Sequence, residues 1–104
     1  MQIIDFQKCQ NRLNLYLKAG KIIMADYIDA HAFSSNHKEC LLKDGLCGCF
    51  YCIEIFDPRL ITEWVQDING TAICPFCGID SIIGQSSGYP ITEEFLSEMN
   101  RHWF

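Results

Sequence analysis

Two Cys-x-x-Cys motifs constrain the fold of this chain more than any other feature of its sequence. The first motif runs from Cys49 to Cys52 and the second from Cys74 to Cys77, and 21 residues separate them. A gap of two residues lets a tight turn present both sulfurs on one side. Two such turns can place four thiolates at the corners of the tetrahedron that a structural zinc ion requires. The sequence therefore predicts one structural Zn²⁺ bound by Cys49, Cys52, Cys74 and Cys77.

A site of four cysteines leaves no coordination position open for the water or substrate that a catalytic zinc binds. We therefore expect the ion to stabilise the fold and not to catalyse a reaction. Gly78 follows the second motif and suits the left-handed backbone that such turns often need. Ile53 occupies the equivalent place in the first motif and does not suit it. We expect the first turn to differ in geometry from the second.

The other three cysteines leave one question open. Cys47 lies two residues before Cys49, so this stretch offers three thiols for two ligand positions. Cys49 and Cys52 have the better spacing, and Cys47 is interpreted as a neighbouring spare thiol. Cys9 and Cys40 fall on predicted helices and are interpreted as small buried hydrophobes. The odd total of seven cysteines and the lack of a secretory signal favour a reducing cytosol, where such motifs bind metal.

The length of the chain indicates one domain. With 104 residues, of which 49% are hydrophobic, the chain can form one small core but not two. Apolar periodicity, capping residues and turn signals predict the following elements: helices over 5–18 and 22–32, a short helix capped by Ser34 or Ser35, strands over 53–56 and 71–73, a helix over 57–68 that begins at Asp57-Pro58, and a final helix capped by Thr92.

These elements predict a small α+β fold that is mostly helical and contains a zinc-ribbon-like or treble-clef-like four-cysteine module. The single domain, 1–104, comprises a helical N-terminal part (1–45), a zinc module with an inserted helix (46–83) and a C-terminal helix (92–104). The apolar faces on both sides of the zinc module need it as a packing surface, so we do not expect it to fold separately.

The charge of the chain argues against one class of partner. Thirteen acidic and eight basic side chains give a formal net charge of −5, and four thiolates around Zn²⁺ take it to about −7. Such a chain repels phosphate backbones, whereas its field favours a cationic protein surface. No stretch reaches the roughly eighteen uninterrupted apolar residues that cross a bilayer. We expect a cytoplasmic protein that binds neither membrane nor nucleic acid.

Two histidines keep an enzymatic alternative open. His31 and His37 flank the turn at 34–36, where either could serve as the general base of a metal-dependent nuclease or hydrolase. Capping and surface solvation explain the same residues without chemistry, and we favour that interpretation. Ser81 lacks the Gly-x-Ser-x-Gly context of a nucleophile elbow. The sequence therefore predicts no catalytic residue.

Four segments together resemble a family of small, uncharacterised bacterial and phage cytoplasmic proteins. The segments are CGCFYC at 47–52, CPFCGIDS at 74–81, SGYPIT at 87–92 and the pair Trp103-Phe104. The resemblance covers roughly the last two-thirds of the chain, from near Ser34. It implies a zinc site at the four cysteines of the two motifs and a cytosolic location, and it implies no particular reaction.

These observations predict a small cytosolic zinc protein that binds another protein. One specific version is an immunity or inhibitor protein that masks a cationic partner through charge complementarity. The alternatives are the metal-dependent nuclease or hydrolase that uses His31 or His37, and a zinc-ribbon regulator associated with nucleic acid. The acidic charge makes the last alternative the weakest. No feature of the sequence indicates an oligomeric state.

Overall fold

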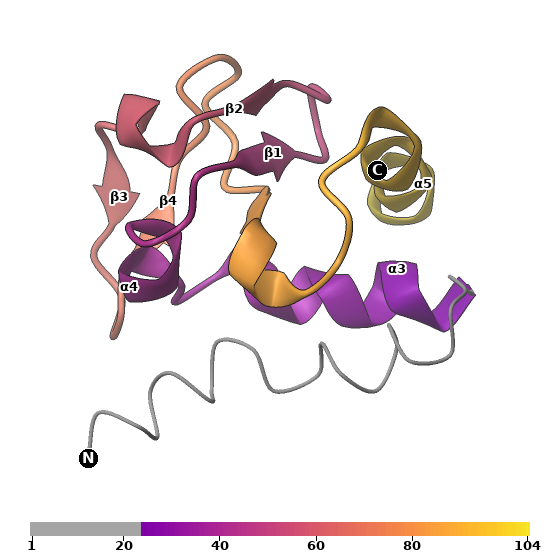
Figure 1. Ribbon diagram of the computed structural model, residues 1–104, viewed down its shortest axis with the longest axis horizontal. Helices are drawn as coiled ribbons and strands as arrows, with labels where there is room; N and C mark the ends of the chain where they lie inside the picture. Colours follow the sequence, from indigo (N-terminus) through magenta and orange to yellow (C-terminus); the bar gives the residue numbers. More distant parts are fainter. Residues whose placement is uncertain (1–23) are drawn as a thin grey trace.

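The computed structural model describes residues 24–104, which form helices and two small antiparallel sheets (Figure 1). The described helices are α3 (Met24–Ala30), α4 (Lys38–Leu41) and α5 (Glu93–Trp103), with 3₁₀ turns at His31–Ser34, Pro58–Leu60 and Gln85–Ser87. The described strands are β1 (Cys47–Cys49), β2 (Ile55–Phe56), β3 (Trp64–Val65), β4 (Thr71–Ala72) and β5 (Ile82–Gly84). The predicted α+β class is confirmed, and the helix predicted over 5–18 lies outside the described residues.

Strand β1 is the centre of the larger sheet, which has the order β2-β1-β5. It pairs antiparallel with both neighbours, and its register with β5 places Cys47 opposite Gly84 and Cys49 opposite Ile82. Strands β3 and β4 form a separate antiparallel pair. Because alternate side chains of a strand share a face, Cys47 and Cys49 lie on the same face of β1. This face carries Cys47 and Cys49, the first cysteine of the first motif, into the core.

The larger sheet separates two clusters of buried side chains. Ile82 and Ile83 are neighbours on β5 and both fully buried, but they belong to different clusters because they point to opposite faces. The first cluster, on the cysteine face, consists of Leu41, Cys47, Cys49, Phe56, Ile61, Ala72, Cys74 and Ile82. The second cluster, which includes the apolar face of α5, consists of Ala30, Phe50, Ile83, Tyr89, Phe95, Leu96 and Met99.

Helix α5 begins at the predicted cap and packs closely on β1. Thr92 Oγ1 accepts a hydrogen bond of 3.2 Å from the Phe95 N–H, as an N-cap does. At Gly48 the helix approaches the strand so closely that an added Cβ would lie 2.7 Å from Leu96 Cδ1 and 3.2 Å from Ile91 Cγ2. Glycine at this position therefore permits the contact between helix and strand backbone.

The helix predicted over 57–68 is wrong, because the structure has one 3₁₀ turn there, followed by strand β3. The predicted start is present, since Asp57 Oδ1 accepts a hydrogen bond of 2.9 Å from the Arg59 N–H. The chain then becomes extended at Ile61, with φ −75° and ψ 124°. The aromatic and β-branched residues of β3 pair with β4, an arrangement that suits such side chains better than a helix does.

The short helix α4 begins without the predicted serine cap. Neither Ser34 nor Ser35 is its N-cap; His37 occupies that position, and its side chain makes no capping bond. The amides of His37 and Lys38 instead donate to the carbonyl of Gly70, at 2.9 and 3.1 Å. A backbone carbonyl from the turn between β3 and β4 therefore satisfies the free amides of the helix end.

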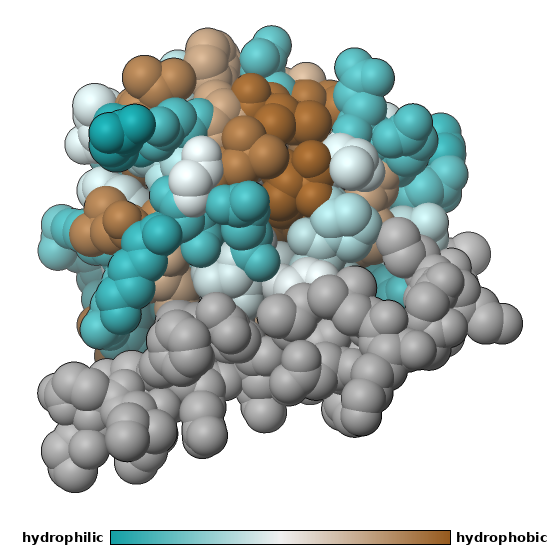
Figure 2. All heavy atoms as spheres, in the orientation of Figure 1, coloured by the Kyte–Doolittle hydropathy of each residue, from teal (hydrophilic) through white to brown (hydrophobic). Residues whose placement is uncertain are grey.

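The most prominent hydrophobic region on the face drawn in Figure 2 lies near the centre of the described residues. Hydrophobic side chains gather there in the neighbourhood of β1, and hydrophilic side chains surround them. Within residues 24–104, no helix has both the length and the apolar character needed to cross a membrane.

Candidate metal centre

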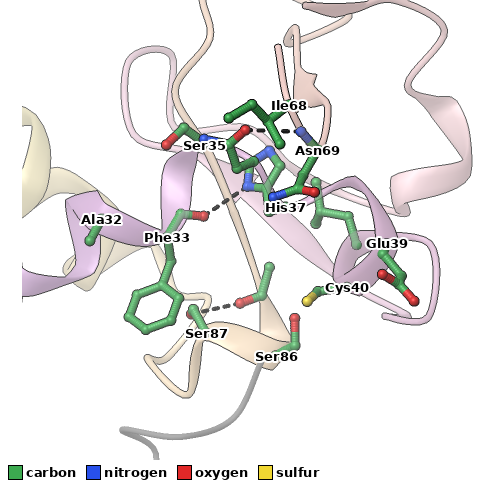
Figure 3. A pocket seen from close by; sticks show the side chains of 13 residues that line it. Ala32, Phe33, Ser35, His37, Glu39, Cys40, Ile68, Asn69, Ser86 and Ser87 are labelled. Atoms are coloured by element: carbon green, nitrogen blue, oxygen red, sulfur yellow. Dashed lines mark hydrogen bonds between the residues drawn. The ribbon is translucent and has the colours of Figure 1, made fainter. Parts of the chain in front are cut away.

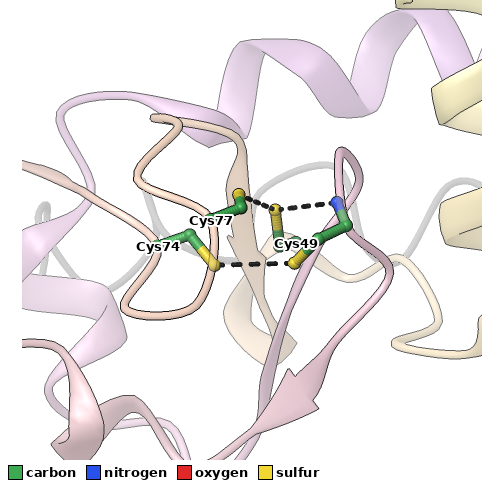
Figure 4. Close-up of side chains that lie close together, drawn as sticks. Cys49, Cys74 and Cys77 are labelled. Atoms are coloured by element: carbon green, nitrogen blue, oxygen red, sulfur yellow. Dashed lines mark hydrogen bonds between the residues drawn. The ribbon is translucent and has the colours of Figure 1, made fainter.

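The four cysteines of the two motifs meet at one point in the structure (Figure 4). Cys49 ends β1 and Cys52 lies in the turn that follows, while Cys74 and Cys77 lie in the turn after β4. All four sulfurs lie within 4.8 Å of one another. The Sγ–Sγ distances are 3.6 Å for Cys49–Cys77 and 3.7 Å for Cys52–Cys74. Sulfurs bound at about 2.3 Å to one tetrahedral ion are about 3.8 Å apart, so the cluster could hold one metal ion.

The two cysteine turns have equivalent backbone hydrogen bonds. Ile53 N–H donates to the Cys49 carbonyl at 2.8 Å, and Gly78 N–H donates to the Cys74 carbonyl at 2.9 Å. The first cysteine of each turn also donates its own N–H to the carbonyl five positions later, at 3.0 Å in both turns. Ile53 and Gly78 have similar positive φ angles of 69° and 80°. The prediction that the first turn differs in geometry is therefore wrong.

Ile53 adopts a backbone conformation that β-branched residues rarely occupy. Such a conformation costs on the order of 1–3 kcal/mol and persists only where the surrounding structure imposes it. The half-buried side chain of Ile53 packs against the second core cluster, which contains the apolar face of α5. The side chain of Ile53 therefore packs the first cysteine turn against the core beneath α5. Glycine has no side chain and could not make this contact.

Hydrogen bonds to the sulfurs follow the same pattern in the two turns. Cys49 Sγ accepts from the Tyr51 N–H at 3.3 Å and from the Cys52 N–H at 3.4 Å. In the second turn Cys74 Sγ accepts from the Phe76 N–H, also at 3.4 Å. Amide donors of this kind stabilise the ionised form of a thiol. In both turns, backbone amides therefore point toward the sulfur of the first cysteine.

Ser81 belongs to the site, although sequence reasoning considered it only as a nucleophile. Its side chain is buried, and its Oγ lies 3.1 Å from Cys49 Sγ, where the hydroxyl can donate to the sulfur. The Ser81 carbonyl also accepts a hydrogen bond of 2.9 Å from the Phe50 N–H. Such a donor behind a ligand orients it and spreads its charge. In the sequence, Ser81 is recognisable only as the residue that precedes the apolar segment of β5. Its contact with Cys49 follows from the pairing of β5 with β1, which the sequence does not reveal.

The pKa values of the cysteines differ across the cluster. Burial acts to raise the pKa of Cys49, but the hydrogen bonds from Ser81 and from backbone amides outweigh it, and the net shift is downward. Burial raises the pKa of Cys52 to about 11. Burial and the adjacent Cys49 also raise the pKa of Cys77. Once one thiol of the cluster is ionised, its negative charge disfavours ionisation of the neighbouring thiols unless a cation lies among them. This set of sulfurs therefore suits a metal ion that binds thiolates.

The fifth cysteine near the cluster, Cys47, is not one of the four sulfurs that meet. It is fully buried on β1, and burial raises the pKa of its thiol to about 12, so it is a neutral core thiol. Cys40, on α4, is disulfide-bonded. The interpretation of Cys40 as a small buried hydrophobe is therefore wrong. Cys9 lies outside the described residues.

The two histidines of the enzymatic alternative have different surroundings. His37, but not His31, lines a pocket of about 460 Å³ beside α4 (Figure 3). Its Nδ1 lies 2.7 Å from the Phe33 carbonyl, and its Nε2 accepts from the Ala72 N–H at 3.1 Å. Backbone groups thus occupy both ring nitrogens. His31 is exposed, and its ring centroid lies 4.0 Å from that of Trp103.

The fold and the cluster define a small α+β protein with a four-cysteine site that could coordinate one metal ion. Comparison of the chain with protein-family models, with curated proteins and with solved structures found no match. The resemblance to small bacterial and phage proteins therefore stays a prediction. The function has to be argued from the chemistry of the site and from the surface around it.

Proposed function

We propose that the chain is a protein-binding module whose fold is stabilised by one structural zinc ion. The observation that carries the metal assignment is the convergence of four cysteine sulfurs within 4.8 Å. Zn²⁺ accepts four thiolates in tetrahedral geometry without redox chemistry. Four sulfurs complete its coordination shell, so substrate has no place on the ion. The ion therefore acts on the fold, by joining the turn after β1 to the turn after β4.

The charge distribution supports a cationic partner. Residues 24–104 contain twelve of the thirteen acidic side chains of the chain but only four of its eight basic ones. Two of these four basic residues, Arg59 and Arg101, form ion pairs with Asp57 and Glu98. Zinc with four thiolates would add a further net charge of about −2. A basic protein surface is the partner that such a field attracts most strongly, as for an immunity or inhibitor protein.

The zinc assignment can be tested with two cysteine variants of the same chemistry. Cys77→Ser removes one of the four clustered sulfurs, whereas Cys47→Ser changes a nearby buried thiol outside the cluster. We expect Cys77→Ser to lose zinc and melt well below the parent, because metal-binding free energy contributes to folding free energy. Cys47→Ser should keep one zinc per chain. Metal analysis and thermal unfolding measure both, and a fully zinc-loaded Cys77→Ser protein would contradict the four-ligand assignment.

The binding role requires a separate experiment. Affinity purification of the tagged chain from its native cells, followed by mass spectrometry, should recover a stoichiometric protein of basic isoelectric point. Raising the salt concentration should weaken the complex, since charge attraction between exposed groups is screened. Recovery of no stoichiometric protein, or of an acidic one held equally at high salt, would contradict this role while leaving the zinc assignment intact.

A further inference from the structure

A line of aromatic rings runs from the end of α5 to the first cysteine turn. We define the aromatic stripe as His31, Phe50, Tyr51, Trp103 and Phe104. Neighbouring ring centroids are 4.0 Å apart for His31–Trp103, 5.8 Å for His31–Phe50, 5.8 Å for Phe50–Phe104 and 4.8 Å for Tyr51–Phe104. Phe50 is buried beneath the stripe, whereas Tyr51, Trp103 and Phe104 are 46%, 38% and 60% exposed.

Hydrogen bonds hold the stripe in place. Asn100, on α5, donates from Nδ2 to the carbonyls of Phe50 and Tyr51, at 3.1 Å in both cases. Trp103 donates from Nε1 to the Tyr27 carbonyl, also at 3.1 Å. These bonds join α5 to the cysteine turn and to α3. The exposed rings are therefore positioned before a ligand binds, which lowers the entropic cost of binding.

The stripe lies beside the four-cysteine cluster. Tyr51 and Phe50 are the two residues between the cysteines of the first motif, so their backbone is part of the proposed metal centre. Exposed Glu54 is part of the same turn, since its carbonyl accepts the Cys49 N–H at 3.0 Å. Zinc with four thiolates carries a net charge of about −2 at this place. A ligand at the stripe therefore meets aromatic faces and negative charge together.

We propose that the aromatic stripe is the docking surface for an arginine-bearing segment of a basic partner protein. The planar guanidinium of arginine stacks on aromatic faces and is weakly hydrated, so it suits exposed rings next to negative charge. This proposal rests on the proposed function and names the surface and the side chain through which it acts. A single-stranded nucleic acid would also stack on aromatic rings, but its phosphates would be repelled by the twelve acidic side chains of residues 24–104.

The proposal is tested by titrating the ¹⁵N-labelled, zinc-loaded full chain with hexa-arginine, hexa-lysine and hexa-glutamate peptides. We expect hexa-arginine to shift the amide signals of Tyr51 and Phe104 and the indole signal of Trp103. It should bind more tightly than hexa-lysine, and hexa-glutamate should not bind. Shifts that avoid the stripe, or equal affinity for the arginine and lysine peptides, would overturn the proposal.

Two pairs of substitutions provide the matched control. Tyr51→Leu with Phe104→Leu keeps apolar side chains but removes two exposed rings, and we expect it to weaken hexa-arginine binding at least about fivefold. Leu60→Ala with Val65→Ala changes side chains that are 51% and 40% exposed outside the stripe, and should weaken binding less than twofold. Equal effects of the two pairs would contradict the proposal.

Measurements of zinc content and of self-association separate the remaining outcomes. If the leucine variant keeps one zinc and its melting temperature, weaker binding reports the lost rings and not a lost fold. If the parent chain binds one zinc but no arginine peptide at millimolar concentration, the docking proposal fails while the structural zinc stands. Dimerisation through the stripe in sedimentation experiments, or tighter binding of a single-stranded oligonucleotide than of hexa-arginine, would also overturn it.

Discussion

His37 joins three parts of the described chain through one neutral imidazole. Its Nε2 accepts a hydrogen bond from the Ala72 N–H of β4, so the proton of the neutral ring is on Nδ1 and is donated to the Phe33 carbonyl. The side chain is only 7% exposed. Burial lowers the pKa of His37, and the effect outweighs the Phe33 hydrogen bond and the charge of Asp67, which act to raise it. The residue therefore has a structural role.

This environment predicts how stability depends on pH. Because the pKa of His37 is lower in the folded protein than in the unfolded chain, acidification favours the unfolded state. The contribution is fully present above the unfolded pKa of about 6.5 and is lost as pH falls below it, by at most about 1.4 kcal/mol per pH unit. His37→Gln, which keeps a donor and an acceptor but cannot be protonated, should remove this component.

The measurement is urea unfolding of both proteins at a series of pH values from 7.5 to 5.5. Loss of a metal ion from the cysteine cluster on acidification would affect both proteins alike, so the difference between their pH profiles isolates His37. The parent should lose stability more steeply than the variant as the pH decreases. Parallel profiles would show that His37 is not held as the neutral form.

Among the elements, β1 connects the two halves of the described fold. One face of this strand carries Cys47 and Cys49 into the first core cluster. At Gly48, the opposite face of the strand is in close contact with α5. Strands β2 and β5 pair on either side. The position of the candidate metal centre relative to α5 therefore depends on this short strand.

Gly48→Ala should destabilise the protein. The added methyl group would overlap Leu96, and overpacking of this kind costs about 1–3 kcal/mol. Gly45→Ala is the matched control, because an added Cβ there would be 3.6 Å from Gln85 Oε1, an ordinary contact. Thermal unfolding of the zinc-loaded proteins should show a lower melting temperature for Gly48→Ala only. Equal melting temperatures would mean that α5 does not pack on β1 in this way.

Elements with local signals were predictable from the sequence. The Cys-x-x-Cys spacing identified the four sulfurs that converge, because a tight turn depends on few neighbouring residues. Helix α5 was predicted because its cap, Thr92, and its apolar residues lie within one short segment. The strands at 55–56 and 71–72 fall within predicted strands for the same reason.

Features that depend on distant pairing were not predictable. Strands β1 and β5 have only three residues each. They form strands because they pair with each other, although they lie far apart in the sequence. The segment 57–68 has helical periodicity, but part of it forms strand β3 because it pairs with β4. Ile53 is held at a positive φ by the turn and by its core contact, against its local preference. The role of Ser81 appears only when β5 lies beside Cys49.

At the scale of the whole molecule, the candidate metal centre brings together two turns that lie far apart in the sequence. The cluster links the turn after β1 to the turn after β4, and it borders the first core cluster, against which Cys52 and Cys77 pack. A fold of this size has a limited core, so an ion bound at the cluster would contribute a large share of its stability. The single domain and its divisions stay a prediction from the sequence.

The most direct test of this account is X-ray absorption spectroscopy at the zinc edge of the purified full chain. The account predicts one zinc per chain surrounded by four sulfur atoms at about 2.3 Å. The same spectrum should be retained by Cys47→Ser, because the Cys47 sulfur lies outside the cluster. A zinc with nitrogen or oxygen in its first shell, fewer than four sulfurs, or no stoichiometric zinc would contradict the central claim.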